Sequence, residues 1–390
     1  MTSTAIISGA GPAGLAAACL LAQDGVSCAV IAPEFKADPR TTALMQPSIQ
    51  MLKFINIWND ELKTACAPLK QLHLIDDTGN LVTAPTLQFS ASELNLEEFG
   101  WNVPLAQLVP ALRARAETLG VAFFLGTSVS AEADGQMVTV KTESGQTYGA
   151  KILIAADGAN SALRQSLGIE TENWSFDQSA LATSFAHSAS HQCVSTEYHK
   201  SAGPFTTVPL PGNRSSLVWM DRPARIEALL KLGDAELATE IQLETKGNLG
   251  RISDIGPRKA FPMRGQRATT FATKRCIVVG EAAHVLPPIG AQGLNLSLRD
   301  AAQAADLIIG AIDPGSESIL GEYNALRRAD VVPRQQMVNL MNQSLLSSFP
   351  ALALARVAGL IAIANIAPLR NLAMSQGIAP SANLPFAMRG

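Results

Sequence analysis

Three glycines near the amino terminus have the spacing of a turn that binds the phosphates of a dinucleotide. Gly9, Gly11 and Gly14 lie in GAGPAG, between the β-branched strand TAIIS and the Ala- and Leu-rich helix LAAACLLAQ. The first glycine permits a tight turn, the second lets the backbone approach a pyrophosphate, and the third lets helix and strand pack closely. N–H groups at the start of the helix then point at the phosphates. Because a second strand, VSCAVI, completes a strand–helix–strand unit, we interpret the motif as a dinucleotide site and not only a structural glycine turn.

The acid that completes such a site is displaced in this chain. A carboxylate at the end of the second strand would hold the adenosine ribose, and its expected place is near Ala32. The nearest acid is Glu34, after Pro33. Either Glu34 replaces the usual acid from a shifted position, or the ribose is held in another way.

A second stretch, GEAAHVLPPIGAQGLNLSLRD, begins at Gly280 and follows the strand-like run CIVVG. The last residues of this stretch have a pattern typical of a helix. The turn before that helix contains Pro287, Pro288, Gly290 and Gly293. Turns of this composition bring backbone close to another group. Since the turn follows an acid, Glu281, we expect backbone and a carboxylate to approach a bound molecule together.

The elements between these two motifs must position them. Residues 104–119 predict a helix, VAFFLG predicts a strand, and MVTVKTESGQTYGAKILIAADG predicts a hairpin that leads into a buried strand ending at Asp157. Residues 171–264 alternate more and contain turns such as PGNR, which indicates a separate sheet domain. From Gly321 onward the chain is predicted to be helical and apolar.

Composition excludes some partners. With 390 residues, 47% of them hydrophobic, the chain can bury a large core over more than one domain. A net charge of -3 and an aromatic content of 5% give no reason to expect a nucleic-acid partner. The five cysteines form no CxxC pair, which indicates free thiols in a reducing compartment. The start MTSTAIISG lacks the features of a signal peptide, so we expect a cytoplasmic protein.

Three motifs stand in one order: GAGPAG, ILIAADGANSALR ending at Arg164, and the Gly280 stretch. Together they resemble the flavin-dependent aromatic hydroxylases of the para-hydroxybenzoate hydroxylase type. Within that group DPRTTAL, GAQGLNLSLRDA and YNALRRAD are similar to the ubiquinone-biosynthesis hydroxylases. The resemblance runs from Thr4 to about Asp330, with weaker similarity to the end.

The resemblance implies an α/β fold: a Rossmann-like FAD-binding domain with an interposed β-sheet substrate domain and a C-terminal helical segment. The FAD-binding domain is expected to be discontinuous, over residues 1–70, 96–170 and 265–320. The substrate domain is expected over 71–95 and 171–264, and the C-terminal helices over 321–390.

The resemblance also implies a set of cofactor-binding residues. Glu281 would bind the flavin ribityl chain, Pro288 would lie near the ring, and the helix start would face the carbonyl edge of the flavin. A helix N-terminus stabilises the negative charge that reduced flavin carries at that edge. The full set is Gly9, Gly11, Pro12, Ala13, Gly14, Glu34, Arg40, Gln107, Val129, Asp157, Gly280, Glu281, Pro288, Gly293, Leu294 and Asn295. Arg40 and Asp157 would lie near the pyrophosphate and the pyridine-nucleotide path, and the backbone of Val129 by the adenine.

Two of these residues have a second interpretation. Arg40 could instead form a surface ion pair. Asp157 could cap a helix over ANSALRQSL, and both of its roles are compatible.

Some positions depart from the family pattern. The family has Asp where this chain has Glu281, and it places Arg or Gln near Leu105 and Ala106, where Gln107 is out of step. Together with Ala32, these departures keep open a non-catalytic role, as an accessory protein of a quinone-biosynthesis complex that no longer holds FAD. A halogenase or reductase on the same fold is a further alternative, because FGWNVP matches part of a halogenase tryptophan motif.

The implied activity is hydroxylation of a phenolic, polyprenylated quinone precursor with FAD, NAD(P)H and O₂. NAD(P)H would visit the flavin transiently, since only one dinucleotide fingerprint is present. No acid–base pair stands out in residues 171–264, so no catalytic residue is nominated. His187, His191 and His199 lack a carboxylate or Cys at ligand spacing, and no metal is expected. His284, inside the flavin motif, is expected near the cofactor in a packed or a chemical role.

The apolar run from Ala351 to Leu369 has two interpretations. It is long enough to span a membrane, but Arg356 and Asn365 interrupt it. Arg in a bilayer core costs about 2.5–3.5 kcal/mol. A helix packed over the substrate domain is one interpretation. The other is a hydrophobic patch that contacts the inner face of a membrane, as a peripheral protein would, or a polyprenyl tail.

Overall fold

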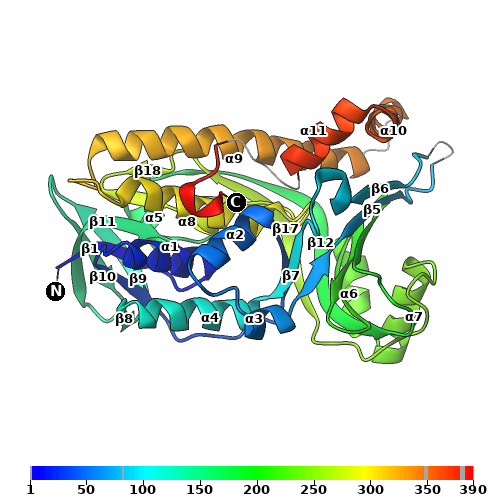
Figure 1. Cartoon of the computed structure of the whole chain (residues 1–390), viewed down its shortest axis with the longest axis horizontal. Helices are drawn as coiled ribbons and strands as arrows, with labels where there is room; N and C mark the ends of the chain where they lie inside the picture. Colours follow the sequence, from blue (N-terminus) through cyan, green and yellow to red (C-terminus); the bar gives the residue numbers. More distant parts are fainter. Residues whose placement is uncertain (1, 81–82, 347–349, 378–382, 390) are drawn as a thin grey trace.

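The computed structural model describes residues 2–80, 83–346, 350–377 and 383–389. Two lobes lie side by side along the longest axis of the molecule (Figure 1). The first contains the amino-terminal strand and the helices packed on its sheet. The second contains a large, mostly antiparallel sheet, in which only β13 and β5 pair in parallel among the described strands, with helices on its outer face.

The first lobe is built on the unit that the Gly9 motif predicts. Strand β1 (Thr2–Ser8), helix α1 (Pro12–Gln23) and strand β2 (Cys28–Ala32) follow one another, and the two strands pair in parallel. Gly25, at φ +79°, turns the chain back after the helix. The predicted strand–helix–strand unit is therefore confirmed.

The sheet of this lobe has the order β18-β19-β11-β1-β2-β8, with β9 and β10 attached to β11 as an antiparallel extension. Its other strands are β8 (Ala122–Leu125), β9 (Ser128–Ala133), β10 (Val138–Thr142), β11 (Thr147–Ala155), β18 (Ala272–Thr273) and β19 (Cys276–Val278). Helices α4 (Leu105–Thr118), α5 (Ala162–Ser166) and α8 (Gln292–Ile308) belong to the same lobe. The predicted hairpin is formed by β10 and β11.

Four cysteine thiols are buried in or beside this core: Cys19, Cys28, Cys66 and Cys276. All five cysteines are free, and Cys193 is half-buried. Burial raises the pKa of the Cys28 thiol to about 11 and that of Cys19 to about 12. The sequence predicted free thiols, and the four buried cysteines pack as small core side chains.

A small sheet joins the lobes. It has the order β3-β7-β4, formed by β3 (Thr41–Met45), β7 (Gly100–Pro104) and β4 (Ala67–Leu69). Helices α2 (Gln46–Phe54) and α3 (Asp60–Thr64) follow β3. The Asn102 side chain on β7 donates to the carbonyl oxygen of Pro209 and to Ser216 Oγ, so the small sheet is fastened to the second lobe.

The second lobe has a sheet of order β20-β17-β12-β15-β14-β13-β5-β6 with β16 beside β12. Its strands are β5 (Gln71–Asp76), β6 (Leu87–Ser90), β12 (Thr171–His187), β13 (Val194–Lys200), β14 (Gly203–Leu210), β15 (Arg214–Asp221), β16 (Ile252–Ser253), β17 (Lys259–Ala268) and β20 (His284–Val285). The short 3₁₀ turns Ala91–Leu94, Gly280–Ala282 and Phe386–Met388 complete the irregular segments. Since β17 extends to Ala268 and β20 includes His284, this sheet includes residues beyond 264.

The two faces of the second sheet differ. Helices α6 (Pro223–Lys231) and α7 (Asp234–Glu244) cover the outer face, over a core that includes Leu181, Phe205 and Trp219. The inner face carries two apolar clusters. We call Ala180, Met220, Met263, Ile289 and Val338 the turn cluster. We call Met45, Leu87, Phe89, Ala91, Phe99 and Met374 the edge cluster.

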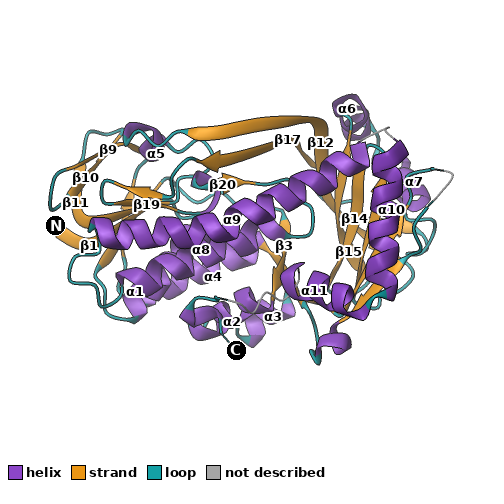
Figure 2. Cartoon of the chain, turned by 90° about the horizontal axis from the view of Figure 1, so that it is seen from above, coloured by secondary structure: helices purple, strands orange, loops and turns teal. Residues whose placement is uncertain are grey.

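Helix α9 (Glu317–Leu346) runs across both lobes (Figure 2). After it come α10 (Pro350–Asn365) and α11 (Ala367–Gly377), which lie beside β5 and β6. No helix in the described ranges is by itself long and apolar enough to span a membrane; α10 and α11 together are, but they are bent by 100°.

The α/β fold class predicted from the sequence is confirmed by this architecture and by the family match reported below. The domain boundaries stay a prediction. Residues 1, 81–82, 347–349, 378–382 and 390 of the expected domains lie outside the described residues.

We expect Trp219→Ala to destabilise the second lobe by about 3–5 kcal/mol, because the indole is a large, fully packed core side chain. Trp219 is 1% exposed. The matched control is Leu243→Ala on α7, a site that is 69% exposed, where the change should be within about 0.5 kcal/mol. Chemical unfolding of both variants measures the difference, and equal losses would contradict the assignment of Trp219 to this core.

Candidate functional site

The glycine turn after β1 is tightly constrained at two of its three glycines. Gly9 has φ +110°, and a Cβ there would lie 2.2 Å from the carbonyl oxygen of Ala156. A Cβ on Gly14 would lie 2.2 Å from the carbonyl oxygen of Gly9. A Cβ on Gly11 would instead meet nothing within 4 Å. The first and last glycines are therefore required for packing, and the middle one faces open space.

That open space lies at the N-terminus of α1. Gly11 is the N-cap of the helix and no side chain caps it; Pro12 follows and Ala13 is buried. The first N–H groups of a helix need partners from outside, and they favour an anion. The turn therefore fits a phosphate group.

The end of β2 shows where the displaced acid lies. Ala32 is buried and its carbonyl oxygen accepts from Gly126 N. Glu34 is exposed, and Val129 on β9 is 41% exposed. The two residues predicted to contact the ribose and the adenine are thus both solvent-facing.

Arg40 forms the ion pair that was the alternative interpretation of this residue. Its Nε lies 2.9 and 2.8 Å from the two carboxylate oxygens of Asp38, and its guanidinium lies 5.1 Å from the centre of the Phe261 ring. The hydrogen bonds to Asp38 raise the pKa of the guanidinium, and the nearby Glu281 carboxylate adds to this effect. Arg40 and Glu281, far apart in sequence, therefore lie close enough for their charges to interact.

The Gly280 turn presents its acid outward. Gly280 has φ +63°, and its N–H donates to Asp300 Oδ2 at 2.9 Å. Glu281 is exposed, and its carboxylate makes no hydrogen bond with any residue the structure describes. Pro288 is also exposed, at the end of the turn.

Helix α8 starts without a side-chain cap, at Ala291 with φ 54°. Gly293, Leu294 and Asn295 form its half-buried first turn. Like the start of α1, this helix start offers N–H groups to an anionic or carbonyl-bearing edge. The two helix starts therefore offer uncapped N–H donors, and the exposed Glu281 carboxylate offers an acceptor.

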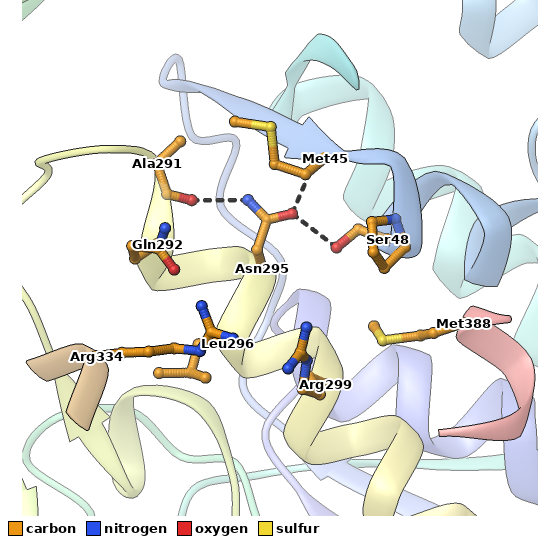
Figure 3. Close-up of a pocket in the computed structure, with 10 residues that line it drawn as sticks. Met45, Ser48, Ala291, Gln292, Asn295, Leu296, Arg299, Arg334 and Met388 are labelled. Atoms are coloured by element: carbon orange, nitrogen blue, oxygen red, sulfur yellow. Dashed lines mark hydrogen bonds between the residues drawn. The ribbon is translucent and has the colours of Figure 1, made fainter. Parts of the chain in front are cut away.

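The Asn295 side chain holds α8 against the small sheet (Figure 3). Its Oδ1 accepts from Met45 N at 2.9 Å and from Ser48 Oγ at 2.7 Å, and its Nδ2 donates to the carbonyl oxygens of Ala43 and Ala291. The predicted role of Asn295 concerned its backbone; the side chain was missed. Only the packing of α8 on β3 reveals it.

A buried ionic network lies behind the turn. Asp300 is fully buried; it accepts from Gly280 N, from His284 Nε2 at 2.7 Å and from Arg327 Nε at 2.7 Å. Asp330 continues the network to Arg327, Arg299 and Arg334. Burial would raise the pKa of Asp330, but these arginines hold it well below its usual range.

His284 thus has a packed structural position, one of the two roles expected for it. Its imidazole is buried and hydrogen-bonded to Asp300, and its Nδ1 has no hydrogen-bond partner among the described residues. Asp300 and Arg327 stand within the motifs LRDA and YNALRRAD, but nothing in the sequence pairs them.

Asp157 lies behind the cap of α5 and is not the N-cap itself, because the N-cap residue is Ser161, whose Oγ accepts from Arg164 N. Its carboxylate accepts from Ser161 Oγ at 2.5 Å and from Leu163 N at 3.3 Å, at the start of α5. Burial raises the pKa of this carboxyl. Gln107 is exposed on the first turn of α4, whereas Leu105 and Ala106 are half-buried.

The histidines of the second lobe bond to protein groups. His187 contacts the Ala189 carbonyl oxygen and Ser215, and His191 contacts the Leu210 carbonyl oxygen. No group of three or more potential metal ligands occurs within the described part of the chain.

The fold and this pair of open helix starts define a flavin-binding α/β protein. Residues 1–338 match the family described as FAD binding domain, so the chain belongs to that family. Ubiquinone hydroxylase UbiL of Rhodospirillum rubrum is 31% identical to it over 384 residues, which are 95% of this chain and 88% of the relative. The 3-demethoxyubiquinol 3-hydroxylase of Escherichia coli is 30% identical over 394 residues, covering 97% of this chain and 98% of the relative.

Among solved structures, p-nitrophenol 4-monooxygenase PnpA from Pseudomonas putida has the same fold, with a TM-score of 0.79 at 19% identity over 98% of this chain and 100% of that one. The predicted FAD cofactor and the predicted class, a FAD-dependent monooxygenase, are confirmed by the family and its relatives.

We expect Gly11→Ala to weaken FAD binding by about tenfold or more, because the methyl group occupies the space where a phosphate would approach; tenfold corresponds to about 1.4 kcal/mol. The thermal stability of the protein without FAD should not change, since the added Cβ meets nothing within 4 Å. Fluorescence titration with FAD and thermal unfolding measure the two effects.

Gly9→Ala is the matched comparison. Its Cβ would collide with Ala156 and its φ is +110°, so it should lower stability even without FAD. If Gly11→Ala bound FAD with unchanged affinity, the phosphate of FAD would not bind at this turn.

Proposed function

We propose that the protein hydroxylates the ring of a phenolic, polyprenylated quinone precursor, using NAD(P)H and O₂. The observation that carries the proposal is the arrangement of the turn and the second sheet. Ile289 and Leu286 of the turn pack with Met220 and Val218 on the inner face of the sheet. An aromatic ring held against this face would lie beside the flavin. The names of the two relatives described above supply the substrate class.

The chain's own residues would hold FAD at two ends. The α1 start would bind the pyrophosphate, and the α8 start would stabilise negative charge at the flavin carbonyl edge. Glu281, free of other hydrogen bonds within the described residues, would accept from the ribityl chain. When bound, FAD supplies the redox chemistry that activates O₂. The apolar clusters exclude water from the reacting ring.

Hydride would reach the flavin from a pyridine nucleotide that binds transiently. The only GxGxxG sequence is the one at Gly9. Lys259 and Arg40, the latter paired with Asp38, both lie within cation–π distance of Phe261, and they offer cationic groups near Glu281 to the phosphates of such a nucleotide.

The test is the visible absorption spectrum of the purified, desalted protein with and without FAD, followed by product analysis. We expect a stoichiometric flavin band, and NAD(P)H- and O₂-dependent hydroxylation of a prenylated phenol. A protein that binds no FAD would instead act as an accessory component of a quinone-biosynthesis assembly. A flavin band without hydroxylation of any prenylated phenol would overturn the substrate class alone.

Helices α10 and α11 support a contact with the lipid in which such a substrate dissolves. One side of this pair packs on the sheet, through Leu360, Ile363 and Met374. The other side exposes Leu354, Ile361, Ile366, Leu369 and Leu372. Apolar surface of this kind at an interface favours peripheral membrane binding. Arg356 does not oppose it, because its guanidinium is turned inward to Asp76 at 3.7 Å.

We expect Leu354→Gln combined with Leu369→Gln to reduce co-sedimentation with phospholipid vesicles, because each change removes exposed apolar surface from this side. The control is Leu243→Gln on α7, a leucine that is more exposed than either, and this variant should sediment as the unaltered protein does. If the unaltered protein stays in the supernatant, the membrane contact is wrong.

A further inference from the structure

A buried acid–base pair lies on strand β13. His199 Nε2 is 2.7 Å from Glu197 Oε1, and the two residues are 4% and 9% exposed. The His199 Nδ1 atom makes no hydrogen bond with any described residue. A carboxylate that accepts from Nε2–H fixes the imidazole tautomer and leaves the Nδ1 lone pair free to take a proton.

The strand register places the pair on the inner face of the second sheet. Glu197 pairs with Thr206, Thr206 pairs with Val218, and Val218 pairs with Ala182. Directly paired residues share a face. Thr206, Val218 and Ala182 are half-buried, whereas Leu181, Phe205 and Trp219 on the outer face are fully buried. The pair therefore belongs to the face that meets the Gly280 turn.

Apolar clusters lie on both sides of the pair along the sheet. Leu74, the β5 partner of Glu197, packs on the edge cluster, which also contacts Ala291 at the start of α8. On the other side Val218 and Met220 belong with the turn cluster, which includes Ile289. A histidine and a carboxylate are costly to bury in such surroundings without a partner, and each supplies the other's partner here.

The other charged groups near the pair are already occupied. Asp76, the β5 partner of His199, accepts from Thr78 Oγ1 and from the Ala84 N–H, and it faces Arg356 of α10. The facing positions on β14, Pro204 and Thr206, are uncharged. Glu197 is therefore the acid that orients His199.

We propose that His199 is the catalytic base that removes the phenolic proton of the substrate, with Glu197 as its positioning residue; this rests on the proposed function. The O–H bond of the phenol breaks and its proton passes to His199 Nδ1. The phenolate and the imidazolium form together, and Glu197 stabilises the imidazolium. Deprotonation places electron density on the ring carbons that receive oxygen.

The proton is returned at the end of the cycle. NAD(P)H and O₂ supply the electrons and the oxygen atom; the second oxygen atom leaves as water. The hydroxylated carbon loses its hydrogen as a proton to solvent, which restores aromaticity. His199 then gives its proton back to the phenolate oxygen, so that the pair ends in its starting state.

The test uses a chromogenic phenol, 4-nitrophenol carrying one prenyl group, whose phenolate absorbs in the visible range. Bound to the unaltered protein below its own pKa, the probe should appear as phenolate. His199→Gln should bind it as the neutral phenol. The matched control is His73→Gln on the neighbouring strand β5, where His73 contacts Gln71 and the phenolate band should persist.

Turnover gives a second readout. Hydroxylation by His199→Gln should fall by about 10²–10⁴-fold, the usual contribution of a general base. Flavin reduction by NAD(P)H should be unchanged, so that NAD(P)H is consumed with release of hydrogen peroxide. Glu197→Gln should weaken the phenolate band too, because a neutral amide no longer stabilises the imidazolium.

If both variants ionise the bound probe as the unaltered protein does, His199 is not the base. If His199→Gln fails to fold, measurements on Glu197→Gln and on the unaltered protein test whether His199 is the base. In the latter, NMR of isotope-labelled histidine should show one of the five imidazoles becoming protonated as the probe binds, and no such change would overturn the proposal. Failure of the unaltered protein to bind any prenylated phenol would instead refute the proposed function.

Discussion

The carboxylate of Asp300 is the interaction on which the geometry of the site depends. It is the shared acceptor for Gly280 N, for His284 and for Arg327, and so it joins the Gly280 turn and the following helix α8 to α9. A buried ion pair of this kind contributes little net stability relative to a well-packed apolar core, but it is costly to break because a charge is left unpaired. Its effect here is specificity: the turn bearing Glu281 and the start of α8 are set at one position relative to each other.

The parts of this structure that follow from local sequence were predicted correctly. The strand–helix–strand unit at Gly9 and the helix after Gly293 depend on residues that are neighbours in the chain. Contacts between distant segments were not predictable. The side-chain bonds of Asn295 need α8 to lie on β3, and the ionic network needs α8 and α9 to lie together. Glu197 and His199 stand two residues apart, as any strand residues on one face do, and only the register with β14 and β5 sets them in an apolar face that meets the turn.

The two faces of the sheet in the second lobe are packed differently. Aromatic and aliphatic side chains on the outer face make a closed core beneath α6 and α7. The inner face is built from small and medium side chains, such as Ala180 and Met220, and is closed only where α9, α10 and the turn lie on it. Leu181, Phe205 and Trp219 on the outer face are thus almost completely buried, whereas Ala182 and Val218 on the inner face are half-buried. An acid–base pair can be accommodated there because its two members satisfy each other.

The buried thiols have a consequence for durability. An oxygen-using flavoprotein that reduces its cofactor without a correctly placed ring releases hydrogen peroxide, and the species that peroxide attacks is the thiolate. Burial raises the pKa of Cys19, Cys28, Cys66 and Cys276, so these four remain protonated and shielded. Cys193, half-buried at the start of β13, is the remaining cysteine. The thiols of the core are therefore protected from peroxide, and Cys193, next to the start of β13, is the most accessible cysteine of the chain.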